Sequence, residues 1–208
     1  MIVILDFGLG NLKSIQNGFL YMGHKTIVTR DKKIIQDADS LILPGVGAFK
    51  DGMDRLKRFD LVPLIRDALS QKKPILGICL GLQLLFSESE EFGQHIGLEL
   101  LKGTVKSFAG SLKIPHMGWN TLRITRRITL LDGIKDGDFF YFVHSFYANP
   151  EEQGIVAGET EYGINFPSVI QKDNLMATQF HPEKSSKHGL KILDNFVKIS
   201  DAAKARSI

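Results

Sequence analysis

Residues 1–86 alternate short apolar runs with segments of helical periodicity, and no other feature of the sequence constrains the fold as strongly. The apolar runs of strand length lie at Met1–Asp6, Lys25–Thr29, Ser40–Pro44 and Pro74–Ile78. Helical spacing of apolar side chains follows the first run, with Asn11 as a predicted N-cap and Gly23 as the predicted end. It resumes through Met53–Leu56 and Leu61–Leu69. The alternation predicts an α/β fold, with an open, mostly parallel sheet and flanking helices.

The second half of the chain predicts a different arrangement, in which strands follow one another with little helix between them. These strand candidates are Thr104–Phe108, Phe139–Val143, Ile155–Gly158, Ser168–Gln171 and Met176–Phe180. Strands joined without crossover helices favour antiparallel pairing, so we expect some antiparallel strands here. A last amphipathic helix is expected over about Lys187–Ile199, and the small, polar tail Asp201–Ile208 is expected to fray. We find no repeat and no composition break, and we expect one domain over residues 1–208.

Composition and charge exclude several classes of function. A net charge of +3 without a long basic block does not indicate a nucleic-acid partner. The chain has one cysteine, so we expect no internal disulfide and a reducing, cytoplasmic location. The apolar start is too short for a signal peptide, and no run approaches the roughly 20 apolar residues of a membrane span. The histidines are not spaced as a metal cluster, and no complete phosphate or dinucleotide loop is present, so we expect no metal and no cofactor.

The only cysteine, Cys79, lies at the end of a predicted strand, where Leu80–Phe86 reads as the start of a helix. Gly77 and Gly81 flank it at two residues on either side. A lone cysteine in an apolar run is ordinarily a small buried hydrophobe. A strand–turn–helix with flanking glycines, however, is the geometry of a nucleophile elbow, in which the tight turn needs small neighbours. The helix N-terminus would also favour thiolate over thiol.

A cysteine nucleophile needs a base, and the base needs a group that orients it. His181 follows the apolar strand Met176–Phe180 and is followed at once by Pro182 and Glu183. The imidazole is therefore expected at the carboxyl end of a strand, which is where Cys79 is also expected. Taken alone, His-Pro-Glu is a common turn.

The motifs together resemble the class I glutamine amidotransferases, the glutaminases with a catalytic triad. The resemblance rests on P-G-V-G at 44–47, G-I-C-L-G-L-Q at 77–83 and Q-F-H-P-E at 179–183. Within this family, further stretches resemble the glutaminase subunits that serve histidine biosynthesis. These stretches are D-F-G-L-G-N-L-K-S-I at 6–15, P-G-V-G-A-F at 44–49, I-P-H-M-G-W-N at 114–120, Y-F-V-H-S-F-Y at 141–147 and F-H-P-E-K-S at 180–185.

The resemblance implies a role for particular residues in glutamine hydrolysis. It implies that Cys79 attacks the side-chain carbonyl of glutamine, that His181 transfers protons, and that Glu183 orients His181. The oxyanion would be held by the backbone N–H groups of Val46 and Leu80. Contacts to bound glutamine are implied for Gly45, Gly47, Gln83, His144, Ser145 and Phe146, although Phe146 departs from the tyrosine usual in the family. Structural support of a strand end is an equally good interpretation of His144.

The resemblance also implies a heterodimer with a (β/α)8-barrel cyclase, since released ammonia needs an acceptor. The residues implied at this interface are Asn11, Met117, Trp119, Tyr141 and Lys184, and the neighbouring Gly118 and Asn120 suggest that Trp119 lies in a loop. Three alternatives remain open from the sequence. They are a paralogous glutaminase that supplies ammonia to a sugar-amidinating enzyme of polysaccharide biosynthesis, another thiol hydrolase of the same fold, and a non-catalytic binding module.

Overall fold

The main sheet of the protein has both parallel and antiparallel strands. The structure is a computed structural model that describes residues 1–108 and 113–206. Within this part of the chain, the strand order of the main sheet is β2-β1-β3-β4-β14-β13-β12-β9. The strands are β1 (Ile2–Leu5), β2 (Thr26–Thr29), β3 (Ser40–Leu43), β4 (Ile75–Ile78), β9 (Arg123–Ile124), β12 (Val156–Glu161), β13 (Asn165–Lys172) and β14 (Leu175–Thr178). The pairs from β2 to β14 are parallel, and those from β14 to β9 are antiparallel. The predicted α/β fold class is confirmed.

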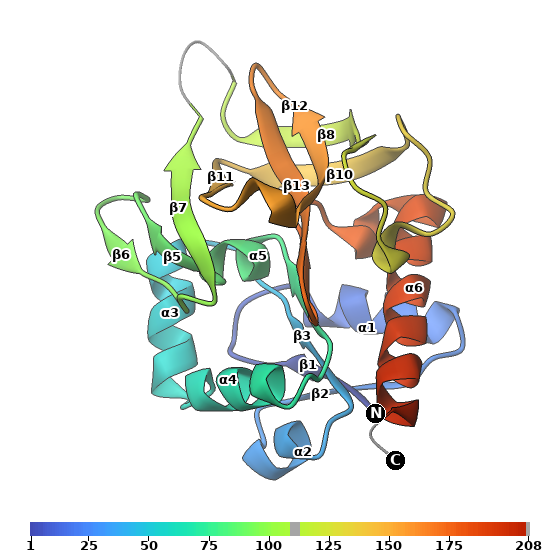
Figure 1. The fold of residues 1–208 in the computed structure, drawn as a ribbon. Coiled ribbons are helices and arrows are strands. Elements are labelled where there is room, and N and C mark those ends of the chain that lie inside the picture. The colour runs from blue at the N-terminus through green and yellow to red at the C-terminus, as the bar shows by residue number, and fades with distance from the viewer. Residues whose placement is uncertain (109–112, 207–208) are drawn as a thin grey trace.

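Helices cover both faces of the parallel strands, because successive side chains of a strand point to opposite faces. Val3, Leu5 and Leu43 pack on one face, whereas Ile4 and Ile42 pack on the other. The first face is covered by α2 (Lys32–Gln36), α3 (Phe49–Arg58), α4 (Val62–Ser70) and α5 (Leu80–Leu84). The second is covered by α1 (Leu12–Tyr21) and the long α6 (Ser186–Ala205). Figure 1 shows α6 upright on one side of the sheet and α3 with α4 on the other.

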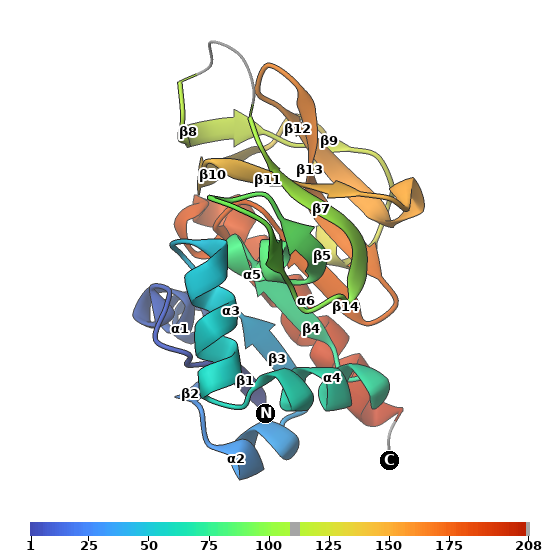
Figure 2. The ribbon, with the colours of Figure 1, turned by 90° about the vertical axis from the view of Figure 1, so that its left-hand side faces the viewer.

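Two smaller sheets lie beyond the carboxyl end of β4. One has the order β11-β7-β5-β6 and the other pairs β10 with β8. Their strands are β5 (Phe86–Ser89), β6 (His95–Ile96), β7 (Leu101–Ser107), β8 (His116–Thr121), β10 (Phe139–His144) and β11 (Phe146–Pro150). The described residues also form short 3-10 helices at η1 (Thr129–Leu131), η2 (Gln153–Ile155) and η3 (Pro182–Lys184). Figures 1 and 2 show β8, β10 and β12 above the end of β4 at which α5 begins.

The structure corrects two sequence-based predictions about element ends. The helix predicted over Leu80–Phe86 stops at Leu84, because Phe86 begins β5 and pairs with Leu101 of β7. The predicted fraying of Asp201–Ile208 is wrong as far as Ala205, where α6 ends. Most of Asp201–Ala205 is exposed, but its two sides are anchored to the sheet. The buried Ser200 hydroxyl donates to Ser40 Oγ of β3 across 2.8 Å, and Lys204 Nζ donates to Asp39 Oδ2 across 3.1 Å. Positions 207 and 208 of the predicted tail lie outside the described residues.

Among the described residues, no helix combines the length and the apolar character needed to cross a membrane.

Candidate active site

Cys79 lies in the tight turn between β4 and α5 with a backbone φ of 54°. A positive φ is strained for a residue with a side chain, and such strain is common at functional sites. The flanking glycines are explained by the close approach of this turn to its neighbours. A Cβ on Gly81 would lie 1.8 Å from the Leu43 carbonyl oxygen of β3, and a Cβ on Gly77 would lie 3.0 Å from the backbone of Gly81. The predicted elbow geometry is present.

The pairing of β4 with β14 brings His181 to the same edge of the sheet as Cys79. Ile78 and Thr178 are partners in this parallel pair, and the Cys79 N–H donates to the Thr178 carbonyl across 2.8 Å. The chain continues from β14 to His181, whose own N–H donates to the Tyr141 carbonyl of β10 across 3.0 Å. The carboxyl ends of two adjacent parallel strands therefore carry the two groups.

Glu183 fixes the proton on one nitrogen of the His181 ring. Its Oε1 lies 2.8 Å from His181 Nδ1, and both side chains are almost fully buried. A carboxylate accepts, so Nδ1 carries the hydrogen and Nε2 is left for the reacting partner. Apart from its interaction with the Cys79 sulfur, Nε2 has no hydrogen-bond partner within the described residues, and Glu183 Oε2 has none there either. Nε2 is therefore free to exchange a proton.

The surroundings of His181 favour its protonated form. Burial opposes the charge, but the negative charge of the Cys79 sulfur and the Glu183 carboxylate outweigh it and raise the pKa of His181 to about 10. This arrangement of a thiol, an imidazole and a carboxylate that orients the ring is the one that nucleophilic catalysis by a cysteine requires.

The Leu80 N–H, a predicted oxyanion donor, is already occupied. It donates to the carbonyl oxygen of Gly45 across 3.4 Å. Gly45 lies tightly against this residue, since a Cβ on Gly45 would lie 2.9 Å from Leu80 Cβ. Val46 and Gly47 follow on the exposed part of the loop, and Gly47 has a φ of 98°. In this arrangement the loop presents a carbonyl, not an N–H, to the start of α5.

A cavity of about 320 Å³ opens beside Cys79, a size that small-molecule sites commonly have. Its lining residues are Val46, Gly47, Cys79, Leu80, Gln83, Glu91, Pro115, Val143, His144, Ser145 and Phe146. All of the predicted glutamine contacts except Gly45 are among them, and Gly45 lies against Leu80 at the edge. Residues from both halves of the chain therefore meet in one cavity, as expected if they bind one ligand.

Gln83 lies on α5 and is 5% exposed. Its Nε2 donates to the Phe146 carbonyl across 2.9 Å, and this carbonyl also accepts from His144 Nδ1 across 2.8 Å. Because Gln83 Nε2 is committed to the protein, Oε1 is the atom left to accept an N–H of a ligand. Gln83 is thus part of the cavity wall as well as a candidate ligand contact.

His144 forms a buried pair with His116, a contact that the sequence analysis did not predict. His116 Nδ1 lies 3.0 Å from His144 Nε2, and His116 Nε2 lies 3.2 Å from Asn120 Nδ2. Burial lowers the pKa of His116 to about 4 and that of His144 to about 3. Both rings are neutral near pH 7, so they hold the segment at Phe146 in place without carrying charge.

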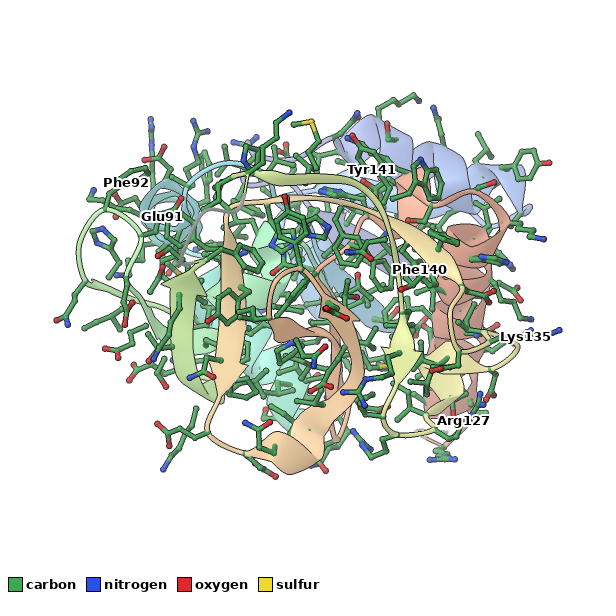
Figure 3. The ribbon with its side chains drawn as sticks, turned by 90° about the horizontal axis from the view of Figure 1, so that it is seen from above. Glu91, Phe92, Arg127, Lys135, Phe140 and Tyr141 are labelled. Carbon is green, nitrogen blue, oxygen red and sulfur yellow. The ribbon has the colours of Figure 1, made fainter. Side chains whose placement is uncertain are left out.

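Glu91 is a cavity residue that sequence reasoning missed. The carboxylate is 9% exposed and accepts from the Phe49 N–H, at the start of α3, across 2.5 Å. Burial raises the pKa of Glu91, although this hydrogen bond opposes the effect. Figure 3 shows Glu91 next to α3. A buried carboxylate in the cavity complements a cationic group such as an α-ammonium. No local sequence pattern separates it from its exposed neighbour Glu90, so only the fold reveals it.

Three of the five predicted interface residues, Met117, Trp119 and Tyr141, lie on one side of the β8–β10 pair. The expected loop around Trp119 is instead β8, in which Trp119 pairs with Tyr141. Period-2 alternation points Met117, Trp119, Phe139 and Tyr141 outward, and three of these are more than half exposed. We call these four residues the outer face. Phe139 was missed, although its place in an alternating strand could have indicated it.

The remaining two predicted interface residues lie at the surface. The Lys184 ammonium lies 5.9 Å from the centre of the Tyr141 ring, at the edge of the outer face. Asn11 is exposed and caps α1, where its side chain accepts from the Ser14 N–H across 3.1 Å. Asn11 thus has a structural role in addition to the predicted one.

Across the described part of the chain, no group of three His, Cys, Asp or Glu side chains is placed to hold a metal ion.

Comparisons with known proteins agree with this geometry. A family model described as "Glutamine amidotransferase class-I" matches residues 3–199. The chain is 50% identical over 203 residues to "Imidazole glycerol phosphate synthase subunit HisH" of Syntrophotalea carbinolica, covering 94% of this chain and 98% of that protein. It is 52% identical over 195 residues to the protein of the same name from Moorella thermoacetica, covering 94% and 93%. A crystal structure titled "glutamine amidotransferase" shares the fold with a TM-score of 0.76 at 16% identity, covering 97% of this chain and all of that one, 100%.

Proposed function

Because the chain belongs to the class I glutamine amidotransferase family, we propose that it is the glutaminase subunit of an imidazole glycerol phosphate synthase. It hydrolyses L-glutamine to glutamate and ammonia and passes the ammonia to a cyclase subunit in histidine biosynthesis. The observation that carries the chemistry is the buried His181–Glu183 pair beside Cys79 at the ends of β4 and β14. The relatives that carry the synthase name cover nearly the whole chain, so the sugar-amidination alternative is not favoured.

The proposed reaction is acyl transfer in two steps through Cys79. The Cys79 thiolate attacks the side-chain carbonyl of glutamine, and His181 gives its Nε2 proton to the departing ammonia. A thioester is left on the sulfur. His181 then takes a proton from water, which attacks the thioester and releases glutamate and the thiolate. Glu183 holds the ring through Nδ1 in both steps, so that Nε2 always faces the reaction.

Substrate recognition is proposed to use both walls of the cavity. Glu91 would pair with the α-ammonium of glutamine, and Gln83 Oε1 would accept an N–H of the substrate. Ser145 and Phe146 also line the cavity, and contacts to glutamine through their backbone would tolerate phenylalanine in place of the family's usual tyrosine at position 146. The oxyanion would be held by the N–H groups of Val46 and Leu80 once the Gly45 carbonyl has turned away.

We propose a heterodimer with a (β/α)8-barrel cyclase that docks on the outer face. Exposed aromatic side chains commonly anchor interfaces, and this face has Trp119 and Phe139. The same strand β10 continues to Val143, which lines the cavity, so a partner on the outer face would sit at the cavity's edge. The chain is proposed to act as one domain in the cytoplasm, where its lone thiol remains reduced.

The decisive experiment measures glutamate release by the pure protein, alone and with a cyclase loaded with its ribonucleotide ligand. Strong activation by the loaded cyclase, abolished by Cys79→Ala, is the expected result. Comigration of the two proteins on gel filtration at micromolar concentration is expected as well. Glutamate release that is indifferent to the cyclase would contradict the assigned partner, and release that survives Cys79→Ala would contradict the assigned nucleophile.

A further inference from the structure

Gln179 contacts the sulfur of Cys79 but is not among the residues that line the cavity. It lies between β14 and His181 and is completely buried. Its Nε2 lies 3.8 Å from Cys79 Sγ, within hydrogen-bond range for sulfur, and its Oε1 lies 3.1 Å from Gln83 Nε2. A buried amide is costly unless its donors and acceptors are paired. Both ends of this amide meet partners, and one of them is the reacting atom.

The backbone carbonyl of Phe146 determines which end of the Gln179 amide is the NH2 group, although the two residues are linked only through Gln83. The Phe146 oxygen can only accept, so the Gln83 atom 2.9 Å from it must be the NH2 group. The second hydrogen of that NH2 group points to Gln179, and the atom that receives it must be an oxygen. The remaining end of the Gln179 amide is therefore its NH2 group, and this group faces Cys79.

Besides its interaction with His181, the sulfur has polar contacts with Val143 and Gln179, and these two favour different protonation states. The Val143 carbonyl, 3.8 Å from Sγ, can only accept and therefore favours the thiol. The Gln179 N–H can only donate at this end and therefore favours the thiolate. His181 would take the proton from the thiol, whereas the Gln179 N–H would stabilise the thiolate that results.

We propose that Gln179 is a positioning residue that donates an amide N–H to Cys79 Sγ, stabilising the thiolate and aiming the sulfur at the substrate carbonyl. The Phe146 carbonyl fixes the orientation of the Gln179 amide through Gln83. Phe146, which lines the cavity, is therefore connected to Cys79 by a continuous chain of hydrogen bonds through Gln83 and Gln179. This inference rests on the proposed function, because it assumes that Cys79 is the nucleophile.

The test is alkylation of the full chain by iodoacetamide between pH 5 and pH 10. Cys79 is the only cysteine, so the labelled site is unambiguous. Gln179→Met keeps the length of the side chain and removes the N–H that donates to Cys79 Sγ. It is expected to slow alkylation at pH 7 about tenfold and to move the half-maximal rate about one pH unit upward, the size of one hydrogen bond to a charged group. With glutamine, kcat is expected to fall about as much, while KM stays within about twofold.

Two further variants make the result decisive. Gln171→Met is the matched control, since Gln171 lies on β13 beside the other end of β14 and should leave the alkylation profile unchanged. Gln179→Asn keeps an uncharged amide but is one methylene shorter, so it withdraws the N–H from Sγ without placing a charge beside it, and it decides the matter if the methionine variant melts early. Profiles of both Gln179 variants that superimpose on that of the wild type would overturn the inference, as would a change confined to KM. Loss of the proposed function would show separately, as glutaminase activity that survives Cys79→Ala.

Discussion

The backbone N–H of Leu80 donates a hydrogen bond to the carbonyl oxygen of Gly45 across 3.4 Å. This carbonyl belongs to the peptide group that joins Gly45 to Val46. In a trans peptide the N–H of the next residue, here Val46, points in the opposite direction from the carbonyl. A half-turn of the Gly45–Val46 peptide would therefore release the Leu80 N–H and present a second donor beside it. Two donors that converge on one point are what a developing oxyanion needs.

Val46→Gly should raise the basal glutaminase rate. Turning the peptide changes φ at position 46, and unusual φ values are costly for a β-branched residue but easy for glycine. We expect a basal rate about tenfold higher and a smaller activation by the loaded cyclase. Glutamate release with and without the cyclase measures both. Val46→Ala is the control, since it shortens the side chain and retains Cβ. A basal rate equal to that of the wild type would speak against a switching peptide.

Glu91→Gln should weaken glutamine binding more than turnover. The amide can still accept from the Phe49 N–H but has no charge for the substrate ammonium. We expect KM to rise about tenfold or more with a smaller change in kcat. Because burial raises the pKa of Glu91, the carboxylate loses its charge earlier on acidification than an exposed one does. KM of the wild type should therefore rise as pH falls, and that of Glu91→Gln should stay flat. Glu90→Gln, at an exposed neighbour, is the control.

His116→Gln should reduce the sensitivity of the fold to acid. The pKa values of His116, about 4, and His144, about 3, lie below 6.5, so the unfolded chain binds more protons than the folded one. The stability contributed by these two rings is present above about pH 6.5 and is lost as pH falls through these values. His181 acts in the opposite direction, because its pKa is raised from 6.5 to about 10, so its contribution to stability is full below about pH 6.5 and is lost as pH rises from there through about 10.

Thermal or urea unfolding between pH 4 and pH 6.5 measures this effect. Removing one imidazole should lower the slope of unfolding free energy by up to about 1.4 kcal/mol per pH unit. Glutamine can reproduce both hydrogen bonds of His116, so the neutral fold should be retained. His24→Gln at the surface is the control. Equal acid slopes in the wild type and His116→Gln would mean that the buried pair is not what acid protonates.

Trp119→Ala should weaken binding of the cyclase without changing the melting temperature. The ring is 52% exposed on β8 and makes an edge-on contact with Tyr141, at 6.0 Å between ring centres. We expect the dissociation constant to rise about 30-fold or more, as for a central aromatic anchor. Phe92→Ala is the matched control. Phe92 is 88% exposed, and Figure 3 shows it on a different side of the molecule from Tyr141. Equal losses in both variants would place the interface elsewhere.

The sequence by itself determined most strands and helices of the parallel part of the sheet and the local geometry of the turn at Cys79. Short-range patterns are set by backbone sterics and hydrophobic periodicity, which act within a few residues. They therefore predicted the β4–α5 elbow with its two glycines, and they placed His181 at a strand end. The same patterns failed at Trp119, where flanking Gly118 and Asn120 suggested a loop although the segment pairs with β10. Strand pairing is a long-range property that local composition does not encode.

Only the tertiary structure decided what each polar group faces. Glu91 and Glu90 are alike in sequence, and burial beside α3 separates them. Gln179 and Cys79 are 100 positions apart and meet because β14 pairs with β4. The direction of each hydrogen bond depends on which partner can only accept, as the Phe146 carbonyl does for Gln83. Such constraints arise when distant segments close around shared buried atoms, and for that reason the hydrogen-bonded chain that ends at Cys79 is visible only in the folded protein.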